Sequence, residues 1–145
     1  MEKKKHHPHQ RNFESVFADL KKSGLKLTEP RKAILQALVE NHGPYSAEEI
    51  HKLFTKKVCD QVTVYRCLTS LEKAGMIKRC EFGDGTARYE FFKKEHHHHV
   101  ICKECKKIEV LDDCELQEID RFARKKGFTD VSHSLEFFGI CSDCK

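Results

Sequence analysis

Two pairs of cysteines have the spacing of metal ligands. Cys102 and Cys105 are separated by two residues, and Cys141 and Cys144 repeat that spacing near the end of the chain. Two intervening residues let both sulfurs of a pair face one ion, and two such pairs supply the four thiolates of a closed zinc site. We therefore expect one structural Zn²⁺ per chain, bound by these cysteines. A redox-active dithiol and unpaired core thiols are the alternatives, and two matched pairs rarely arise by chance.

A run of four histidines, residues 96–99, precedes the first cysteine pair. Alternate residues of a strand face opposite sides, so His97 and His99 would share one face and His96 and His98 the other. Imidazole is a common metal ligand. The pattern therefore predicts two different metal sites served by one segment, with a solvated histidine run as the alternative.

Two residues outside the run can complete these sites. Glu90 lies at the end of a predicted strand before the run, and His133 lies on a predicted strand after it. We expect each of them to reach one face of the histidine segment. The remaining cysteines are isolated and are expected to be small buried apolar residues: Cys59, Cys67, Cys80 and Cys114.

The first part of the chain must position these groups through short helices and a hairpin. Helical periodicity and capping residues predict four helices. The first covers 12–23, and the second is capped by Thr28. The third opens with a capping box at Ser46, and the fourth runs from near Asp60 to Gly75. The pattern then changes to strands over 76–82 and 86–92, joined by a Gly-Asp-Gly turn. This order predicts a winged helix-turn-helix, with the hairpin as the wing.

The second part reads as a β-β-α-β module. We expect strands through 98–102 and over 107–111, a helix over 114–126 and a last strand over 129–138. Ile119 and Phe122 are expected on the inner side of that helix. The fold class is therefore α+β, with a winged-helix domain over 1–92 and a small metal-binding domain over 93–145. So small a module needs a metal or a partner chain for stability.

Composition limits the function classes. The chain has 145 residues, of which 39% are hydrophobic, enough for one domain or two small ones. No apolar stretch approaches the ~20 residues that span a bilayer, and no apolar run follows the basic N-terminus as in a secretory signal. We expect a cytoplasmic protein without a membrane partner. Basic residues exceed acidic ones over 1–95 only, so a polyanion would meet the front of the chain, although such lysines can also merely solubilise a surface.

Several motifs, taken in order, resemble the ferric uptake regulator (Fur) family of bacterial metal- and peroxide-sensing repressors. The resemblance covers about residues 12–144 and includes the histidine run, both cysteine pairs and His133. The other motifs are Leu27-Thr28-Glu29-Pro30-Arg31, Ser46-Ala47-Glu48-Glu49, Thr63-Val64-Tyr65-Arg66 and Ala87-Arg88-Tyr89-Glu90.

The resemblance implies a homodimer, with the metal-binding domain over 93–145 as its dimerisation domain. It also implies that this dimer binds a palindromic operator in double-stranded DNA when metal at the hinge closes its two DNA-binding heads. It places Thr63, Tyr65 and Arg66 on the recognition helix, where Tyr65 can contact thymine methyl groups and Arg66 a base edge or a phosphate. Lys26 resembles the family's minor-groove contact. Arg31 is either a phosphate anchor or a buried salt-bridge partner.

The resemblance also implies the ligands of a regulatory site, namely Glu90, His97 and His99. The family's usual hinge histidine falls on Pro44, which cannot bind a metal, so His42 is the nearest substitute.

An accessory site is implied as well, with three histidines and one acidic residue: His96, His98, His133 and either Glu109 or Glu115. The acidic ligand is out of register with the family, because the best-aligned position is Leu116. His98 stands where the family commonly has aspartate.

The sensed metal is ranked by ligand chemistry. Glu90 stands where zinc sensors commonly have cysteine, which favours Fe²⁺, with Mn²⁺ as a surrogate. Nitrogen in place of oxygen at His98 favours Zn²⁺ as second choice, and peroxide sensing is third because the matching aspartates are missing. Cys80 is a further soft donor, expected to pack within the wing.

Two other classes remain as alternatives, a metalloenzyme and a metal-buffering protein. The sequence contains no His-Glu-x-x-His, nucleophile elbow or Gly-rich phosphate loop, so we expect no enzyme. The winged helix argues against both alternatives.

Overall fold

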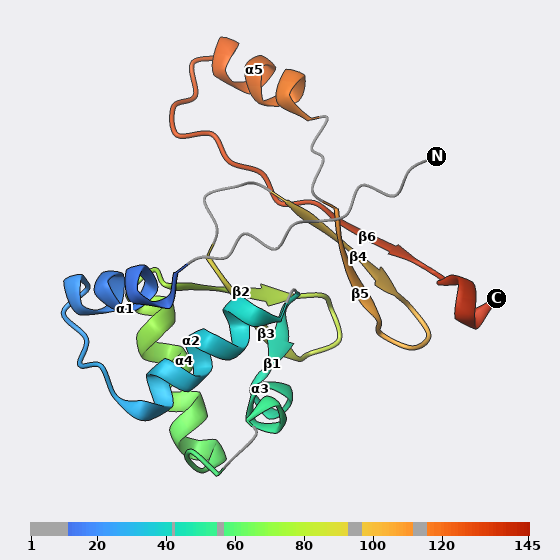
Figure 1. The fold of residues 1–145 in the computed structure, drawn as a ribbon. Coiled ribbons are helices and arrows are strands. Elements are labelled where there is room, and N and C mark those ends of the chain that lie inside the picture. The colour runs from blue at the N-terminus through green and yellow to red at the C-terminus, as the bar shows by residue number, and fades with distance from the viewer. Residues whose placement is uncertain (1–11, 42, 55–56, 93–96, 112–115) are drawn as a thin grey trace.

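The computed structural model describes residues 12–41, 43–54, 57–92, 97–111 and 116–145. Its first part holds four helices: α1 (Phe13–Lys22), α2 (Glu29–Glu40), α3 (Ala47–Leu53) and α4 (Gln61–Lys73). In Figure 1, α2, α3 and α4 lie below β2 (Ile77–Glu81), and α1 lies to its left. This arrangement confirms the predicted helical N-terminal half.

Local side-chain caps explain where these helices begin. Asn12 accepts a hydrogen bond from the Glu14 backbone at α1, and Asp60 accepts one from the Thr63 backbone at α4. Ser46 and Glu49 form the predicted capping box at α3. Thr28 occupies the N-cap position of α2 but its side chain makes no capping hydrogen bond, and a proline in the first turn starts this helix instead.

The first sheet is the wing. Its strands β1 (Tyr45–Ser46), β3 (Ala87–Phe91) and β2 (Ile77–Glu81) lie in that order and pair antiparallel. One face, with Ile77, Tyr89 and Phe91, covers the helical core, whose fully buried side chains include Leu20, Ile34, Leu35, Ile50, Leu68 and Leu71.

The turn of the wing is held by an ion pair. Arg88 donates two hydrogen bonds to Asp84, of 3.1 and 2.8 Å, and its guanidinium lies 5.8 Å from the centre of the Phe82 ring. The hydrogen bonds from Arg88 lower the pKa of Asp84 to about 2. Gly83 and Gly85 have φ of 76° and 74°, values that glycine adopts without strain. These features fix the path of the turn.

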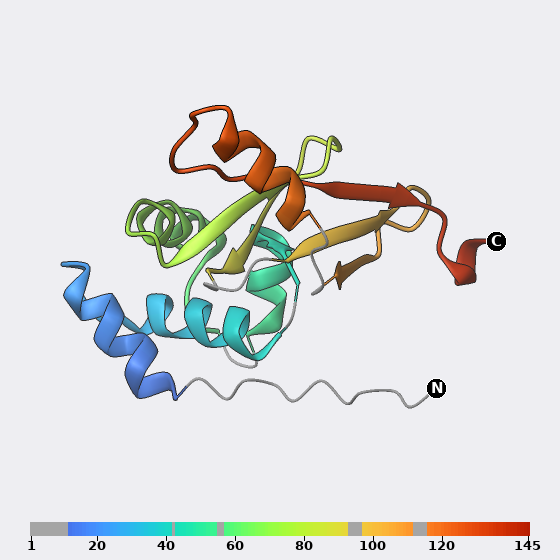
Figure 2. The same ribbon diagram turned by 90° about the horizontal axis from the view of Figure 1, so that it is seen from above.

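The second sheet lies beyond the hinge. Strand β4 (His98–Cys102) is central, antiparallel to β5 (Ile108–Leu111) and parallel to β6 (Glu136–Gly139). Helix α5 (Gln117–Lys125) lies between β5 and β6 in the sequence, and the short 3₁₀ helix η1 (Ser142–Cys144) follows β6. Figures 1 and 2 both show α5 on the far side of the wing from α1 and α2.

Two predictions for this half were wrong. The last strand begins at Glu136 and not at residue 129, because Glu136 pairs with His99 and residues 129–134 lie beyond the described start of β4 at His98. The apolar side chains of α5 are also uncovered within one chain, with Ile119 and Phe122 each 63% exposed. The spacing of these residues predicts the helix but not what covers its apolar face.

Part of the hinge and part of the predicted α5 helix fall outside the described residues, as do His42, His96, Cys114 and Glu115. The domain boundary at 92/93 stays a prediction. Among the described residues, no helix is long and apolar enough to cross a membrane.

Candidate metal centres

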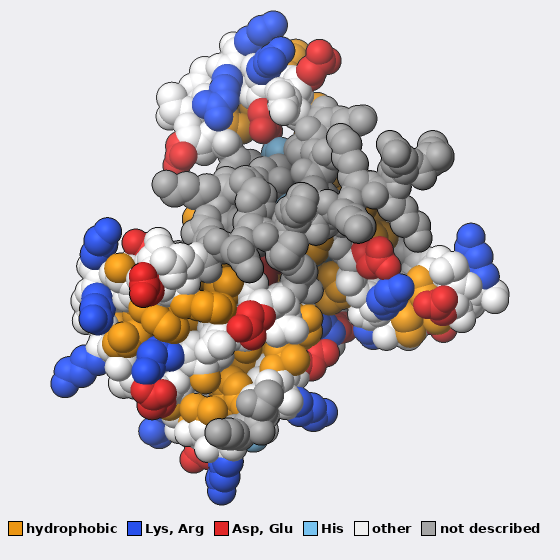
Figure 3. All heavy atoms as spheres, in the orientation of Figure 1, with side chains coloured by type: hydrophobic (Ala, Val, Ile, Leu, Met, Phe, Trp, Pro, Cys, Tyr) orange, Lys and Arg blue, Asp and Glu red, His pale blue; other side chains and the backbone are white. Residues whose placement is uncertain are grey.

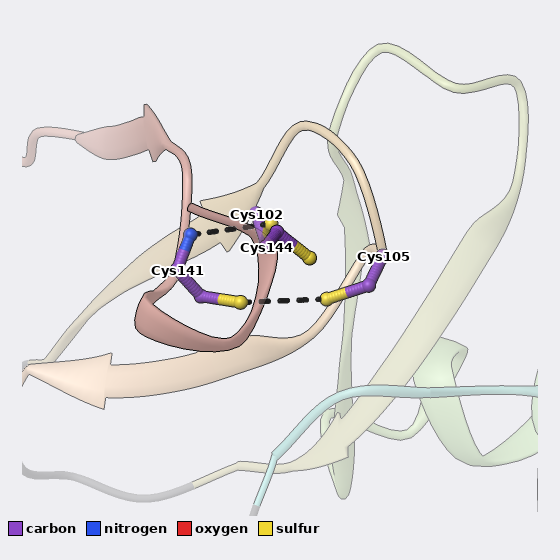
Figure 4. Close-up of side chains that lie close together, drawn as sticks. All are labelled: Cys102, Cys105, Cys141 and Cys144. Carbon is purple, nitrogen blue, oxygen red and sulfur yellow. Dashed lines mark hydrogen bonds between the residues drawn. The ribbon is translucent and has the colours of Figure 1, made fainter.

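The four paired cysteines meet at one end of the second sheet. Because β4 and β6 are parallel neighbours, both end at the same edge, with Cys102 paired to Gly139. Cys105 follows β4, and Cys141 and Cys144 follow β6. The four sulfur atoms lie within 4.8 Å of one another. Figure 4 shows them converging, with Sγ of Cys105 and Cys141 3.7 Å apart.

The electrostatics of this group suit a divalent cation. The Cys141 backbone N–H donates to Cys102 Sγ at 3.4 Å, and this contact and the Cys105 N–H lower the pKa of Cys102 to about 6. The neighbouring sulfurs of Cys141 and Cys105 raise the pKa of Cys144 to about 12. The thiolate of Cys102 is therefore stabilised, whereas that of Cys144 is disfavoured until a cation neutralises the group. Four sulfur donors without an oxygen match the structural zinc site that the spacing predicts.

A second candidate centre joins the wing to the second sheet. Glu90 comes from β3, whereas His97 directly precedes β4 and His99 lies within it. The Nε2 atom of His97 lies 3.1 Å from both Glu90 oxygens, and Nε2 of His99 lies 3.2 Å from Oε2. These three residues form the hinge group. Their donor atoms lie within 4.8 Å of one another, so one oxygen and two nitrogens are placed to hold one ion.

Burial and hydrogen-bond partners shift the pKa of Glu90 in opposite directions. Glu90 is only 6% exposed, and burial alone would raise its pKa. Hydrogen bonds and charges from His97 and His99 outweigh burial and lower the pKa of Glu90 to about 2. The carboxylate is therefore ionised at neutral pH, as a metal ligand must be.

Cys80 contacts the carboxylate of Glu90 in the hinge group. Its thiol donates to Glu90 Oε1 at 3.7 Å, and burial, followed by the charge of Glu90, raises the pKa of Cys80 to about 12. The expectation that Cys80 is buried in the wing holds, but its contact with Glu90 had no signal in the sequence, because ten residues separate the two.

A third group forms on the opposite face of β4. The His133 Nε2 atom lies 3.4 Å from His98 Nε2, and Nδ1 lies 2.9 Å from Oδ1 of Asp120 on α5. Burial, with the charge of His133, lowers the pKa of His98. The two imidazole rings stack with their centres 5.2 Å apart.

Asp120 is the acidic residue that the structure brings to this third group, and of the two predicted ones only Glu109 is among the described residues. Glu109 lies on β5, where its carboxylate pairs with Lys107 at 2.9 Å, and Leu111 rather than Glu109 stands opposite His98. The structure therefore does not bring Glu109 to this group. Asp120 was missed, although it lies one helical turn beyond Leu116, the position that aligned with the family's acidic ligand.

Helix α4 exposes one polar face toward solvent. Tyr65 and Arg66 are exposed and Thr63 is partly exposed, while Val64, Cys67, Leu68 and Leu71 face the core. The Tyr65 hydroxyl donates to Glu48 Oε1 at 2.7 Å. Val62, 58% exposed on the same face, was not singled out from the sequence.

The segment before α2 is held by Arg31. Its Nη1 donates to the Lys26 carbonyl at 2.8 Å, so Arg31 braces the backbone that carries the exposed Lys26 side chain. Figure 3 shows Lys and Arg side chains around the outer edge of the helical half, alternating with acidic ones.

Comparison with known proteins identifies the architecture. The ferric uptake regulator family model matches residues 22–138. The chain belongs to the ferric uptake regulator family. It is 38% identical over 136 residues to a ferric uptake regulation protein of Neisseria meningitidis serogroup C, covering 90% of this chain and 94% of that protein.

Other family members are similar at a lower level. A peroxide-responsive repressor of Staphylococcus epidermidis is 31% identical, with 92% of this chain and 90% of that protein covered. The structure of the Helicobacter pylori ferric uptake regulator superimposes with a TM-score of 0.77 and 33% identity, covering 92% of this chain and 94% of that one, and it has three functional metal-binding sites. The family and the α+β fold expected from the motifs are thus confirmed.

Proposed function

We propose that this protein is a metal-dependent DNA-binding repressor that controls metal uptake genes, with iron as the sensed metal. The observation that carries the proposal is the hinge group, in which a wing carboxylate contacts two imidazoles of the second sheet. An ion held there binds only when the two parts are in contact. Iron is supported by the oxygen and nitrogen donors of the group and by the ferric uptake regulation proteins among its relatives.

The switch follows from differential binding. A metal shifts an equilibrium only by the difference between its affinities for the closed and open arrangements. Glu90 moves with the wing, and His97 and His99 move with the second sheet. A bound ion would neutralise the buried carboxylate and join these elements. The four cysteines all belong to the second sheet and its end, so their metal cannot report the position of the wing.

DNA binding is assigned to the exposed face of α4. Thr63, Tyr65 and Arg66 would enter the major groove, where Tyr65 meets thymine methyl groups and Arg66 a base edge or a phosphate. Lys26, braced by Arg31, would reach the minor groove.

A homodimer is supported by the uncovered apolar side chains of the second half. These exposed residues are Leu111, Ile119, Phe122, Phe128, Phe137, Phe138 and Ile140. An apolar surface of this kind marks a protein interface. A second copy would cover it, and the twofold symmetry of the dimer would match a palindromic operator.

A zinc uptake regulator is the second candidate function. Two imidazoles and one carboxylate also suit Zn²⁺, so the hinge group alone does not separate zinc from iron, and peroxide sensing ranks third. The third group, His98, His133 and Asp120, is proposed as an accessory site that involves His96 as well.

Other classes fit less well. An enzyme would need an open metal position beside a general base, and a metal buffer would need no recognition helix. We therefore propose a regulator rather than an enzyme, acting in the cytoplasm where its operator lies.

Metal analysis of untagged protein, followed by operator binding titrated with Fe²⁺, Mn²⁺ and Zn²⁺, tests this function. The duplex is obtained by selection from random sequences in the presence of Mn²⁺. We expect one tightly held zinc per chain and selective DNA binding that requires a second metal. A selection that yields no preferred sequence with any of the three metals would refute the repressor, and a response to Zn²⁺ alone would replace iron by zinc.

A further inference from the structure

Cys80 lies next to the carboxylate of Glu90 in the hinge group. Its sulfur is 3.7 Å from Oε1 of Glu90, and the two residues are only 8% and 6% exposed. We propose that Cys80 is a positioning residue that orients Glu90 and thereby sets the metal affinity of the hinge group, an inference that rests on the proposed metal-sensing role of that group.

The strand register explains the contact. Cys80 on β2 pairs with Arg88 on β3, and Glu90 lies two residues further along β3. Directly paired residues and residues two apart on one strand share a face of the sheet, so Cys80 and Glu90 lie diagonally on the same face. This face points away from the helical core and toward the second sheet.

An apolar cluster holds Cys80 in this place. Cys80 and Phe82 of the wing pack against Ile101 of β4, with Ile108 of β5 beside them. The Phe82 ring also meets the His99 ring edge-on, with centres 5.6 Å apart. The thiol is therefore enclosed on the wing side of the hinge group, and its rotation is restricted by close packing. A hydrogen bond in such surroundings is stronger than one in water.

The two oxygens of Glu90 have different neighbours. Oε2 faces His97 at 3.1 Å and His99 at 3.2 Å, whereas Oε1 faces His97 at 3.1 Å and the Cys80 thiol. Only Oε2 contacts both imidazoles. A donor on Oε1 keeps Oε2 turned toward the two histidines.

Cys80 supports the ligand without being one. The donor atoms of Glu90, His97 and His99 lie within 4.8 Å of one another, and the Cys80 sulfur is outside this group. A thiol carries its hydrogen at neutral pH, so it can donate to a carboxylate oxygen. Groups that hydrogen-bond to a metal ligand fix its orientation, and their loss commonly lowers metal affinity.

Three substitutions separate the hydrogen bond from packing. Cys80→Ala removes the donor, Cys80→Val removes it while keeping apolar volume, and Cys80→Ser keeps a donor. Cys67→Ala is the matched control, because Cys67 is also 8% exposed but lies on α4 in the helical core. Urea unfolding of each variant shows that it is folded before metal is added.

The measurement is Co²⁺ binding to protein whose four-cysteine site already holds Zn²⁺, followed by visible and near-ultraviolet absorption. We expect Cys80→Ala and Cys80→Val to lower the affinity for the added Co²⁺ by about tenfold. Cys80→Ser should restore most of it, and Cys67→Ala should leave it unchanged. Wild type and Cys80→Ser should give the same cobalt spectrum, without a sulfur-to-cobalt charge-transfer band.

Two results would overturn the proposal. Unchanged Co²⁺ affinity in both variants that lack a donor would show that Cys80 only fills space in the apolar cluster. A charge-transfer band that is present in wild type and lost in Cys80→Ser would show that Cys80 is a ligand. Failure of the proposed function looks different, since wild-type protein would then bind no added Co²⁺ at the hinge group or would bind it without any effect on DNA.

Discussion

Oε2 of Glu90 lies 3.2 Å from Nε2 of His99, although one side chain belongs to the wing and the other to the second sheet. Both residues are almost fully buried. Two polar groups from different sheets therefore meet where water is excluded. A buried carboxylate needs compensating partners, and here those partners come from across the hinge. Separating the wing from the second sheet removes them, so this contact couples the hinge group to the position of the wing.

Replacing Cys102 by Ser should strip the protein of its tightly held zinc. Three thiolates would remain around an incomplete shell in a part of the chain with a small core, and structural zinc stabilises such folds strongly. Zinc content per chain, with sedimentation to follow the dimer, measures the effect. Cys59→Ser is the control, because Cys59 is not in the four-sulfur group. A Cys102→Ser protein that keeps one zinc and stays dimeric would remove the structural role.

Replacing Arg66 by Ala should weaken operator binding by roughly 1–3 kcal/mol if Arg66 contacts a base edge. A phosphate contact would instead lower affinity about equally on all sequences and make the salt dependence shallower. Titrations of selected and scrambled duplexes at several salt concentrations distinguish the two. Unchanged affinity on both duplexes would place Arg66 outside the interface.

Glu48 should matter for operator recognition through Tyr65. The 2.7 Å hydrogen bond from Tyr65 to Glu48 ties α4, the proposed recognition helix, to the first turn of α3. Glu48→Gln keeps an acceptor and should preserve discrimination between operator and scrambled DNA, whereas Glu48→Ala should reduce it. Equal discrimination by the two variants would show that Tyr65 needs no such support.

The turn of the wing should lose stability in acid. The pKa of Asp84 is about 2 in the folded chain, below its ordinary value of 3.8, so the Arg88 pair stabilises the fold above about pH 3.8 and ceases to do so as the pH falls through 2. Asp84→Asn should lower the free energy of unfolding at pH 7 by no more than about 1 kcal/mol, because the pair is partly exposed to solvent. Urea unfolding of both proteins at pH 7 and near pH 2 checks this, and a difference that is undiminished at the lower pH would rule out the ion pair as its cause.

Local sequence signals such as helix caps predicted much of the fold. Asn12, Ser46 and Asp60 cap helices that the sequence predicts, because a cap acts within three residues. The four cysteines were also predictable as a group, since each pair is set by its own spacing and parallel strands end at one edge.

Contacts that depend on register between distant segments could not be predicted in this way. Asp120 reaches His133 only because of how α5 and the segment before β6 pack, and Cys80 reaches Glu90 only through the pairing of β2 with β3. The prediction that the last strand starts near Thr129 was wrong for the same reason, because a β-like pattern does not show how far the neighbouring strand extends.

The most direct test of the account is operator affinity measured against free metal for wild type and two double variants. His97→Ala/His99→Ala removes two members of the hinge group, and His98→Ala/His133→Ala removes two histidines on the opposite face of β4. We expect the first variant to lose metal-dependent binding while keeping its zinc and its dimer, and the second to switch with a smaller loss. A first variant that still switches like wild type would contradict the central claim that metal at Glu90, His97 and His99 couples the wing to the second sheet.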